Sequence, residues 1–259
     1  MTLLPPVQGI AAIGKDLYII HRKHKAVSVY RSDYPYDLRT EIKRAEFSYP
    51  KDIAAFKKSL YITDAGEKCV WKMGLNLPKR FTAFIKNIGS PFTISISANG
   101  DIVLAQNPSS IYVYNLEGIR IVTVQIKEDI QDIQHAVRTQ AGEFIVSHGN
   151  KESEDRKISL ISSDGDTIQK YTDNCEKQLG PLNQPSHIAI GEAGSVYVAD
   201  VGDNKIIVLN EYLSPNHVVP LLGSSQPTRL CYKDGQLLVG ESNGAIQCFG
   251  VDYLAGYVK

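Results

Sequence analysis

Apolar positions recur along this chain in short runs that follow one fixed order. The clearest unit covers residues 185–210, PSHIAIGEAGSVYVADVGDNKIIVLN. In it a short apolar run, a Gly turn, a second run of alternating aromatic and β-branched residues, a polar turn and a third apolar run follow one another. Runs this short and this rich in β-branched residues predict strands, and no stretch of the chain is convincingly helical. We therefore expect an all-β protein.

The unit recurs six times at a nearly constant interval. The first apolar positions of the units are separated by 43, 41, 42, 52 and 42 residues, and they are Ile10, Ile53, Ile94, Ala136, Ile188 and Leu230. Positions in the middle of the second run keep the same period, and they are Tyr18, Tyr61, Val103, Ile145, Tyr197 and Leu238. Two independent markers thus give one repeat of about 42 residues.

Four short strands in each unit of about 40 residues are typical of the blades of a β-propeller, because each small sheet buries both faces against its neighbours. The sequence predicts a single domain over residues 1–259, a six-bladed β-propeller of four-stranded antiparallel blades. The expected blades are residues 7–47, 50–88, 91–127, 132–182, 185–223 and 227–259. We expect residues 253–259 to supply most of the outer strand of the sixth blade, with residues 2–4 at best adding to it. The longer fourth interval predicts surface insertions at residues 149–157 and 175–183.

The fifth unit resembles an NHL repeat, whose pattern is a Pro, a small or polar pair, I-A-V/I, a Gly turn, V-Y-V-A-D and then N-x-R/K-I-x-V/L. Residues 49–73, YPKDIAAFKKSLYITDAGEKCVWKM, match it more loosely, and the other four units keep the strands but lose the Asp or the Asn. The chain as a whole resembles divergent NHL-like propellers of invertebrate animals. These are related to the C-terminal propeller of tripartite-motif ubiquitin ligases, which recruits protein partners or RNA. The zinc-binding Cys/His spacings of the ligase part are absent from this sequence.

Composition and charge narrow the class of partner. The 28 basic and 28 acidic residues leave a formal charge of zero, which disfavours RNA although residues 21–25 (HRKHK) and 79–80 form local basic clusters. No apolar run is long enough to span a bilayer, and the first ten residues lack the features of a signal peptide. Four Cys residues without a CxxC pair indicate free thiols. We expect a cytoplasmic monomer that does not bind membranes.

In a propeller, the start of the first strand and the end of the second strand meet at one face of the disc, around the mouth of the central channel. The residues immediately before the first apolar position of each unit are Gly9, Asp52, Thr93, His135, His187 and Arg229. The residues that end the second strands are His21, Asp64, Gln106, His148, Asp200 and Glu241. Four of the six His residues fall in these two rings, and His24 lies in the adjoining loop. The candidate binding residues are His21, Asp52, Asp64, His135, His148, His187, Asp200, Arg229 and Glu241.

Each of these residues also has a structural explanation. Asp64 and Asp200 stand where a side chain commonly accepts hydrogen bonds from the backbone of the following turn. His135 and His187 occupy equivalent positions in adjacent units, and they would be channel-wall side chains bonded to water or backbone. Imidazoles beside carboxylates could instead hold a divalent metal or titrate near neutral pH.

Two enzyme classes deserve comparison. Peptidyl-hydroxyglycine lyases are six-bladed propellers whose zinc-binding His residues tend to follow a Pro directly. Here Pro185-Ser186-His187 is one residue out of register and the fourth unit has no such Pro, so that zinc site cannot be assembled. The motifs of lactonase-like propellers and of nucleophilic catalysis are also missing. We therefore expect no enzyme, no cofactor and no metal.

The function that follows is a non-catalytic interaction scaffold that binds a protein partner on the face carrying the two rings and residues 151–156. The resemblance implies a more specific form, the substrate-recognition module of a ubiquitin ligase. The alternatives are a metal-dependent lyase-like or lactonase-like enzyme and an RNA-binding NHL module.

Overall fold

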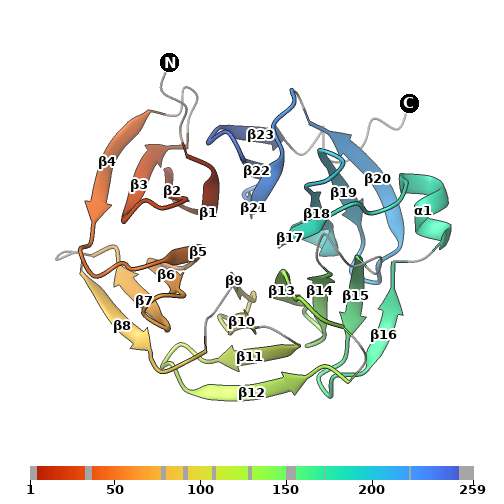
Figure 1. The fold of residues 1–259 in the computed structure, drawn as a ribbon, viewed down its shortest axis with the longest axis horizontal. Helices are drawn as coiled ribbons and strands as arrows, with labels where there is room; N and C mark the ends of the chain where they lie inside the picture. The colour runs from red at the N-terminus through yellow and green to blue at the C-terminus, as the bar shows by residue number, and fades with distance from the viewer. Residues whose placement is uncertain are drawn as a thin grey trace.

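The computed structural model describes residues 5–32, 37–76, 80–89, 93–106, 109–127, 130–149, 156–171, 173–221 and 223–250. In these residues six antiparallel sheets stand around a ring like the blades of a propeller (Figure 1). Within each sheet the strands pair in chain order from the centre of the ring outwards. The predicted fold class, an all-β six-bladed β-propeller, is confirmed.

Each of the first three blades has four strands. Blade one consists of β1 (Val7–Ile13), β2 (Asp16–His21), β3 (Ala26–Arg31) and β4 (Leu38–Lys43). Blade two consists of β5 (Pro50–Phe56), β6 (Ser59–Asp64), β7 (Cys69–Gly74) and β8 (Phe81–Ile85). Blade three consists of β9 (Thr93–Ile96), β10 (Ile102–Gln106), β11 (Ser110–Tyr114) and β12 (Arg120–Gln125).

The last three blades complete the ring. Blade four consists of β13 (His135–Arg138), β14 (Phe144–His148), β15 (Lys157–Ile161) and β16 (Thr167–Lys170). Blade five consists of β17 (Pro185–Ile190), β18 (Val196–Asp200), β19 (Lys205–Leu209) and β20 (Pro215–Pro220). In the described residues, blade six consists of β21 (Pro227–Lys233), β22 (Gln236–Glu241) and β23 (Ile246–Gly250). The predicted closing strand at residues 253–259 and the N-terminal residues 2–4 lie outside the described residues.

Burial explains the sequence pattern. The second strand of each blade is the most deeply buried, and all five residues of β14 are buried. Both faces of each blade pack against a neighbour, so one apolar cluster joins Tyr18 and Val29 of the first blade to Ile62 and Trp71 of the second. The apolar positions of the strand pattern are therefore the residues that pack between blades, and this packing holds the ring together.

One part of the sequence prediction is wrong, because the chain does contain a helix. Helix α1 (Asp173–Leu179) lies on the outer rim between β16 and β17, inside the longer fourth interval (Figure 1). Leu179 is buried in the core of the fourth and fifth blades, and the hydroxyl of Tyr171 donates a hydrogen bond of 2.8 Å to the carbonyl of Gly180 just after the helix. Seven residues are too few to show a helical period in the sequence. No helix among the described residues is long and apolar enough to cross a membrane.

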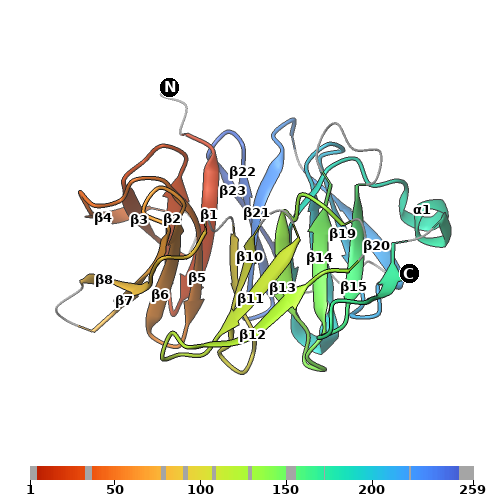
Figure 2. The ribbon, with the colours of Figure 1, turned by 60° about the horizontal axis from the view of Figure 1, so that its bottom comes forward.

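The disc has two faces, which differ in the chain segments that they carry. We call the face at which the first strands begin and the second strands end the entry face. We call the opposite face, which carries the turns between first and second strands, the hairpin face. Figure 2 shows the disc obliquely, with the first strands β1, β5 and β13 running from one face towards the other.

Candidate functional site

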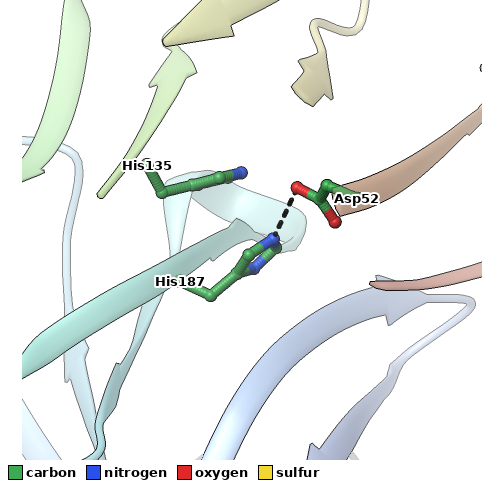
Figure 3. A group of neighbouring side chains, drawn as sticks. All are labelled: Asp52, His135 and His187. Carbon is green, nitrogen blue, oxygen red and sulfur yellow. Dashed lines mark ion pairs between the residues drawn. The ribbon is translucent and has the colours of Figure 1, made fainter. Parts of the chain in front are cut away.

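We call the residues before the first apolar position of each unit the inner ring, and the residues that end the second strands the outer ring. Three of the inner-ring residues meet at the centre of the propeller. Asp52, His135 and His187 are buried, and one nitrogen of each imidazole and one carboxylate oxygen lie within 4.8 Å of one another (Figure 3). His187 Nε2 lies 3.5 Å from Asp52 Oδ2, and the two imidazole rings stack with their centroids 3.8 Å apart. Arg229 joins them, with its Nε 3.6 Å from Asp52 Oδ1. The repeat alignment therefore placed these four residues near one another, while their role in binding stays a prediction.

A repeated contact between blades positions these side chains. The backbone N–H of Ile94 donates to Asp52 Oδ2 at 3.1 Å. The N–H of Ile188 donates to His135 Nδ1, and that of Leu230 donates to His187 Nδ1, both at 3.3 Å. Ile94, Ile188 and Leu230 each lie in a first strand, whose free edge faces the channel. The side chain of one blade thus satisfies a backbone donor of the next blade around the ring.

These contacts fix the tautomer of both imidazoles. A neutral imidazole carries one proton, so an Nδ1 that accepts a hydrogen bond leaves the proton on Nε2. Burial lowers the pKa of His135 well below its ordinary value, and the proximity of His187 and the positive charge of Arg229 act in the same direction, while a backbone contact with Ile94 opposes them. Burial also lowers the pKa of His187, although Asp52 opposes the effect. At neutral pH both side chains are therefore neutral and present Nε2–H donors towards the centre.

The cluster has the residue types of a metal site but not the free lone pairs. A divalent metal binds the unprotonated nitrogen of an imidazole. Here both Nε2 atoms are protonated, and both Nδ1 lone pairs already accept backbone hydrogen bonds. The oxygens of Asp52 accept from the backbone of Ile53 and of Ile94. As arranged, these three side chains do not fit a divalent cation.

The outer-ring residues do not reach the channel. The carboxylate of Asp64 is fully buried and accepts hydrogen bonds from the backbone N–H groups of Ser48, Tyr49, Gly66 and Glu67 and from Trp71 Nε1. Asp200 is also fully buried, and it accepts from the backbone of Asn183 and Gln184; burial raises its pKa. Both carboxylates therefore tie the loop that enters a blade to the end of its second strand.

The other outer-ring residues form similar local contacts. His21 Nδ1 lies 2.9 Å from the carbonyl of Pro5, and His148 Nε2 lies 2.9 Å from Ser159 Oγ. Gln247 Nε2 donates to Glu241 Oε1. His21, His148 and Glu241 are all buried. These contacts join the end of a second strand to the third strand in blades four and six, and to the segment before β1 in blade one.

A cavity, which the sequence analysis did not predict, lies along the central channel. It has a volume of about 1090 Å³ and runs from His135 and His187 to turns on the hairpin face. Exposed turn residues such as Asn99, Gln140 and Ala193 stand at its rim. Polar and apolar groups contribute about equally to its wall. The apolar wall residues include Ile10, Ala12, Ile53, Ala55, Ile94, Ile96, Val137, Ile188, Ile190, Leu230 and Tyr232. We predicted the ligand surface on the entry face, whereas this cavity leads to the hairpin face.

One signal in the sequence could have indicated this cavity. The first strands carry small residues, as in GIAAI and DIAAF, where a filled channel would need larger side chains. Each first strand pairs with only one other strand among the described residues, so its second edge faces the channel. Unpaired edge groups and apolar side chains together make the channel wall suited to a polypeptide or a similar organic ligand.

The other features singled out in the sequence give no further support for a binding site. In the basic segment at residues 21–25, His24 Nε2 lies 3.7 Å from Glu41, and Lys43 lies at the same distance from that carboxylate. Lys79 and residues 151–155 lie outside the described residues. Cys69, Cys231 and Cys248 are free thiols, as predicted.

Comparison with known proteins supports the fold alone. No protein family matches the sequence, and no curated protein is similar enough to match. Among solved structures, virginiamycin B lyase from Staphylococcus aureus is similar with a TM-score of 0.65 and 13% identity over 96% of this chain and 87% of that chain. A streptogramin B lyase gives 0.66 and 13% over 96% and 84%, and the WD40 propeller domain of Doa1 gives 0.67 and 12% over 96% and 94%. These are similarities of a β-propeller, and neither the NHL family nor a relation to ubiquitin ligases is confirmed.

The expectation that the protein is not an enzyme, which was drawn from missing motifs, does not hold. Propellers of the same architecture include lyases that cover nearly all of this chain. The sequence prediction rested on the absence of complete catalytic motifs. Such motifs could not reveal the cluster of Asp52, His135, His187 and Arg229, which come from four blades and which we call the channel floor. An identity of 13% does not carry the lyase reaction over to this chain.

Proposed function

We propose that the protein binds a protein partner by taking a segment of that partner into its central channel from the hairpin face. The observation that carries this proposal is the cavity of about 1090 Å³ along the channel. That volume is at the upper end of ordinary ligand pockets, and it has room for several residues of a peptide. The wall belongs to strands packed between neighbouring blades, so binding needs little rearrangement of the protein.

The channel wall favours a peptide over a purely apolar ligand. Every first strand among the described residues presents one edge without a partner strand, and such an edge offers alternating N–H donors and carbonyl acceptors. An extended segment can pair with these groups while its side chains contact the Ala and Ile residues of the wall. The NHL resemblance adds a narrower form of the proposal, in which the segment marks a protein for ubiquitin transfer.

A peptide selection with a blocked channel tests the proposal. Random peptides displayed on phage are selected on the immobilised protein, and the affinity of the selected peptides is measured by fluorescence anisotropy. The variant Ala98→Trp/Ala141→Trp places two large side chains at exposed rim positions of the cavity. We expect it to weaken peptide binding at least tenfold.

A matched control separates blocking from a general effect of Trp on this face. Glu117 is exposed in the outer turn of the third blade and does not line the cavity. Glu117→Trp should leave the affinity within twofold of the parent protein. Peptides that bind the blocked variant as tightly as the parent would show that the channel is not the site.

Chemical conversion of the channel ligand is the second candidate function. His135 Nε2 and Arg229 Nε are buried and have no hydrogen-bond partner among the described residues. Two such donors could stabilise negative charge on a carbonyl oxygen, as an oxyanion hole does. The test is mass spectrometry of the selected peptides, and of ester analogues, after incubation with the protein and with His135→Asn. A product that forms only with the parent protein would support catalysis.

A further inference from the structure

The hydrogen-bonding capacity that remains at the channel floor is all of one kind. Asp52 Oδ1 accepts from Ile53 N–H at 2.9 Å, and Oδ2 accepts from Ile94 N–H and faces His187 Nε2. The Nδ1 atoms of both imidazoles accept from the backbone, as described above. What remains is His135 Nε2–H, which is buried and has no hydrogen-bond partner among the described residues. Arg229 Nε is occupied by its ion pair with Asp52 Oδ1 at 3.6 Å. The complementary group of a ligand must therefore be an acceptor.

The balance of charge decides which acceptor fits. Asp52 carries a negative charge and Arg229 a positive one, and the two imidazoles are neutral at neutral pH. A second carboxylate at the floor would lie close to Asp52 in a buried place, where like charges repel strongly. A cation would meet two Nε2–H donors. A neutral oxygen, such as that of an amide carbonyl, satisfies the free donor of His135 without adding charge.

We propose that the channel floor recognises a neutral carbonyl oxygen of the entering segment, which accepts a hydrogen bond from His135 Nε2–H beside Arg229. This inference rests on the proposed function, and it specifies the ligand chemistry at one position. The carbonyl reaches the floor through the cavity, of which His135 forms part of the lining. The His187 imidazole has no such role, because its Nε2–H already faces Asp52 at 3.5 Å.

Two Asn substitutions separate recognition from structure. The side-chain oxygen of Asn can replace imidazole Nδ1 as an acceptor, but Asn has no group that reaches the position of Nε2. His135→Asn should therefore keep the hydrogen bond from Ile188 N–H and remove the free donor. His187→Asn is the matched control, because it should keep the hydrogen bond from Leu230 N–H and leave His135 Nε2–H in place.

The experiment is NMR of the full protein labelled with ¹⁵N in its imidazoles. The probes are N-acetylalanine methylamide, which is neutral, and N-acetylalanine, which carries a carboxylate. We expect His135 and His187 to be Nε2–H tautomers, and the neutral probe alone to shift the His135 Nε2 resonance. The selected peptides should bind His135→Asn at least tenfold more weakly and His187→Asn within twofold of the parent.

The results distinguish this inference from the proposal on which it rests. Peptides that are blocked by Ala98→Trp/Ala141→Trp but bind His135→Asn normally would overturn the carbonyl site and leave the channel proposal standing. A neutral probe that shifts His135 Nε2, together with peptides that bind the blocked variant as tightly as the parent, would overturn the channel proposal alone. A preference for the carboxylate probe, or a His135 Nε2 resonance that neither probe moves because a buried water satisfies it, would overturn the inference.

Discussion

At the scale of single residues, Asp64 is a side chain outside the channel that accepts many hydrogen bonds. Its carboxylate accepts five hydrogen bonds in a fully buried position. Asp64→Ala removes all five and leaves buried N–H groups without acceptors. We expect the free energy of unfolding to fall by about 3 kcal/mol, measured by chemical denaturation. Asp166→Ala, which removes an exposed ion pair with Lys127, should change it by less than about 1 kcal/mol.

The channel imidazoles make stability depend on pH. Folding lowers the pKa of His135 and of His187 below the ordinary value of 6.5, because both are buried and Arg229 stands beside them, while Asp52 opposes the shift at His187. Below about pH 6.5 the unfolded chain therefore binds more protons than the folded protein. The free energy of unfolding should fall as the pH drops from 7.5 to 5.5.

Denaturation at these two pH values gives the measurement. The double variant His135→Asn/His187→Asn has no imidazole at the channel floor, so its stability should fall less between pH 7.5 and 5.5. Buried His21, whose pKa burial also lowers, leaves part of the dependence in place. An equal fall in the double variant and the parent would show that the channel pair is not the source.

The repeat alignment predicted the neighbours but not the chemistry of these residues. It placed His135 and His187 in equivalent positions of adjacent blades, which is why their proximity could be expected. It gave no information on the tautomer, because the donors to Nδ1 are backbone groups of Ile188 and Leu230 in the next blade. It also could not show that Asp64 and Asp200 are fully buried, since the loops that bury them vary in sequence.

At the scale of strands, the inner ring contains one position that admits no side chain. A Cβ at Gly9 would lie 2.9 Å from the backbone N and from the side chain of Ile53, at the contact between β1 and β5. Gly9→Ala should push these strands apart and lower the free energy of unfolding by roughly 1–3 kcal/mol. Gly74→Ala, in β7 with open space around it, is the control and should have little effect on the free energy of unfolding. Thermal denaturation of both variants gives the measurement.

Strand order and strand length were predictable because packing between blades imposes a two-residue period on every unit. Helix α1 was not, because it has only seven residues and is held by tertiary contacts such as the buried Leu179. The channel could not be predicted from single strands either. Its width depends on how six first strands stand around the ring, which no single repeat specifies.

At the scale of the whole molecule, the ring depends on the contact between the sixth and first blades. Thr228 Oγ1 lies 2.8 Å from the carbonyl of Val7 and 2.9 Å from that of Gly240, so its hydroxyl links β21 to β1. Thr228→Val removes this link, and we expect it to lower the free energy of unfolding by about 1–2 kcal/mol. Far-UV circular dichroism, which follows all blades, gives the value.

The single Trp shows whether this loss is shared around the ring. Trp71 is buried in the second blade, which is separated from β21 by the first blade. If the blades unfold together, Trp71 fluorescence should report the same midpoint shift in Thr228→Val as circular dichroism. A fluorescence transition that stays at the parent midpoint would mean that the ring opens locally at the junction of β1 and β21.

The six residues of the inner ring are all different in kind apart from its two adjacent His residues. A ring of six identical side chains would accept one ligand in any of six rotational settings about the channel axis, whereas Gly9, Asp52, Thr93, the His pair and Arg229 offer one. The protein forgoes a statistical advantage of about sixfold in affinity. If a segment binds in the channel as proposed, the ring holds it in a single orientation, so the segment presents the same face to the solvent in every complex. A ring with near-rotational symmetry can in this way fix the orientation of its ligand.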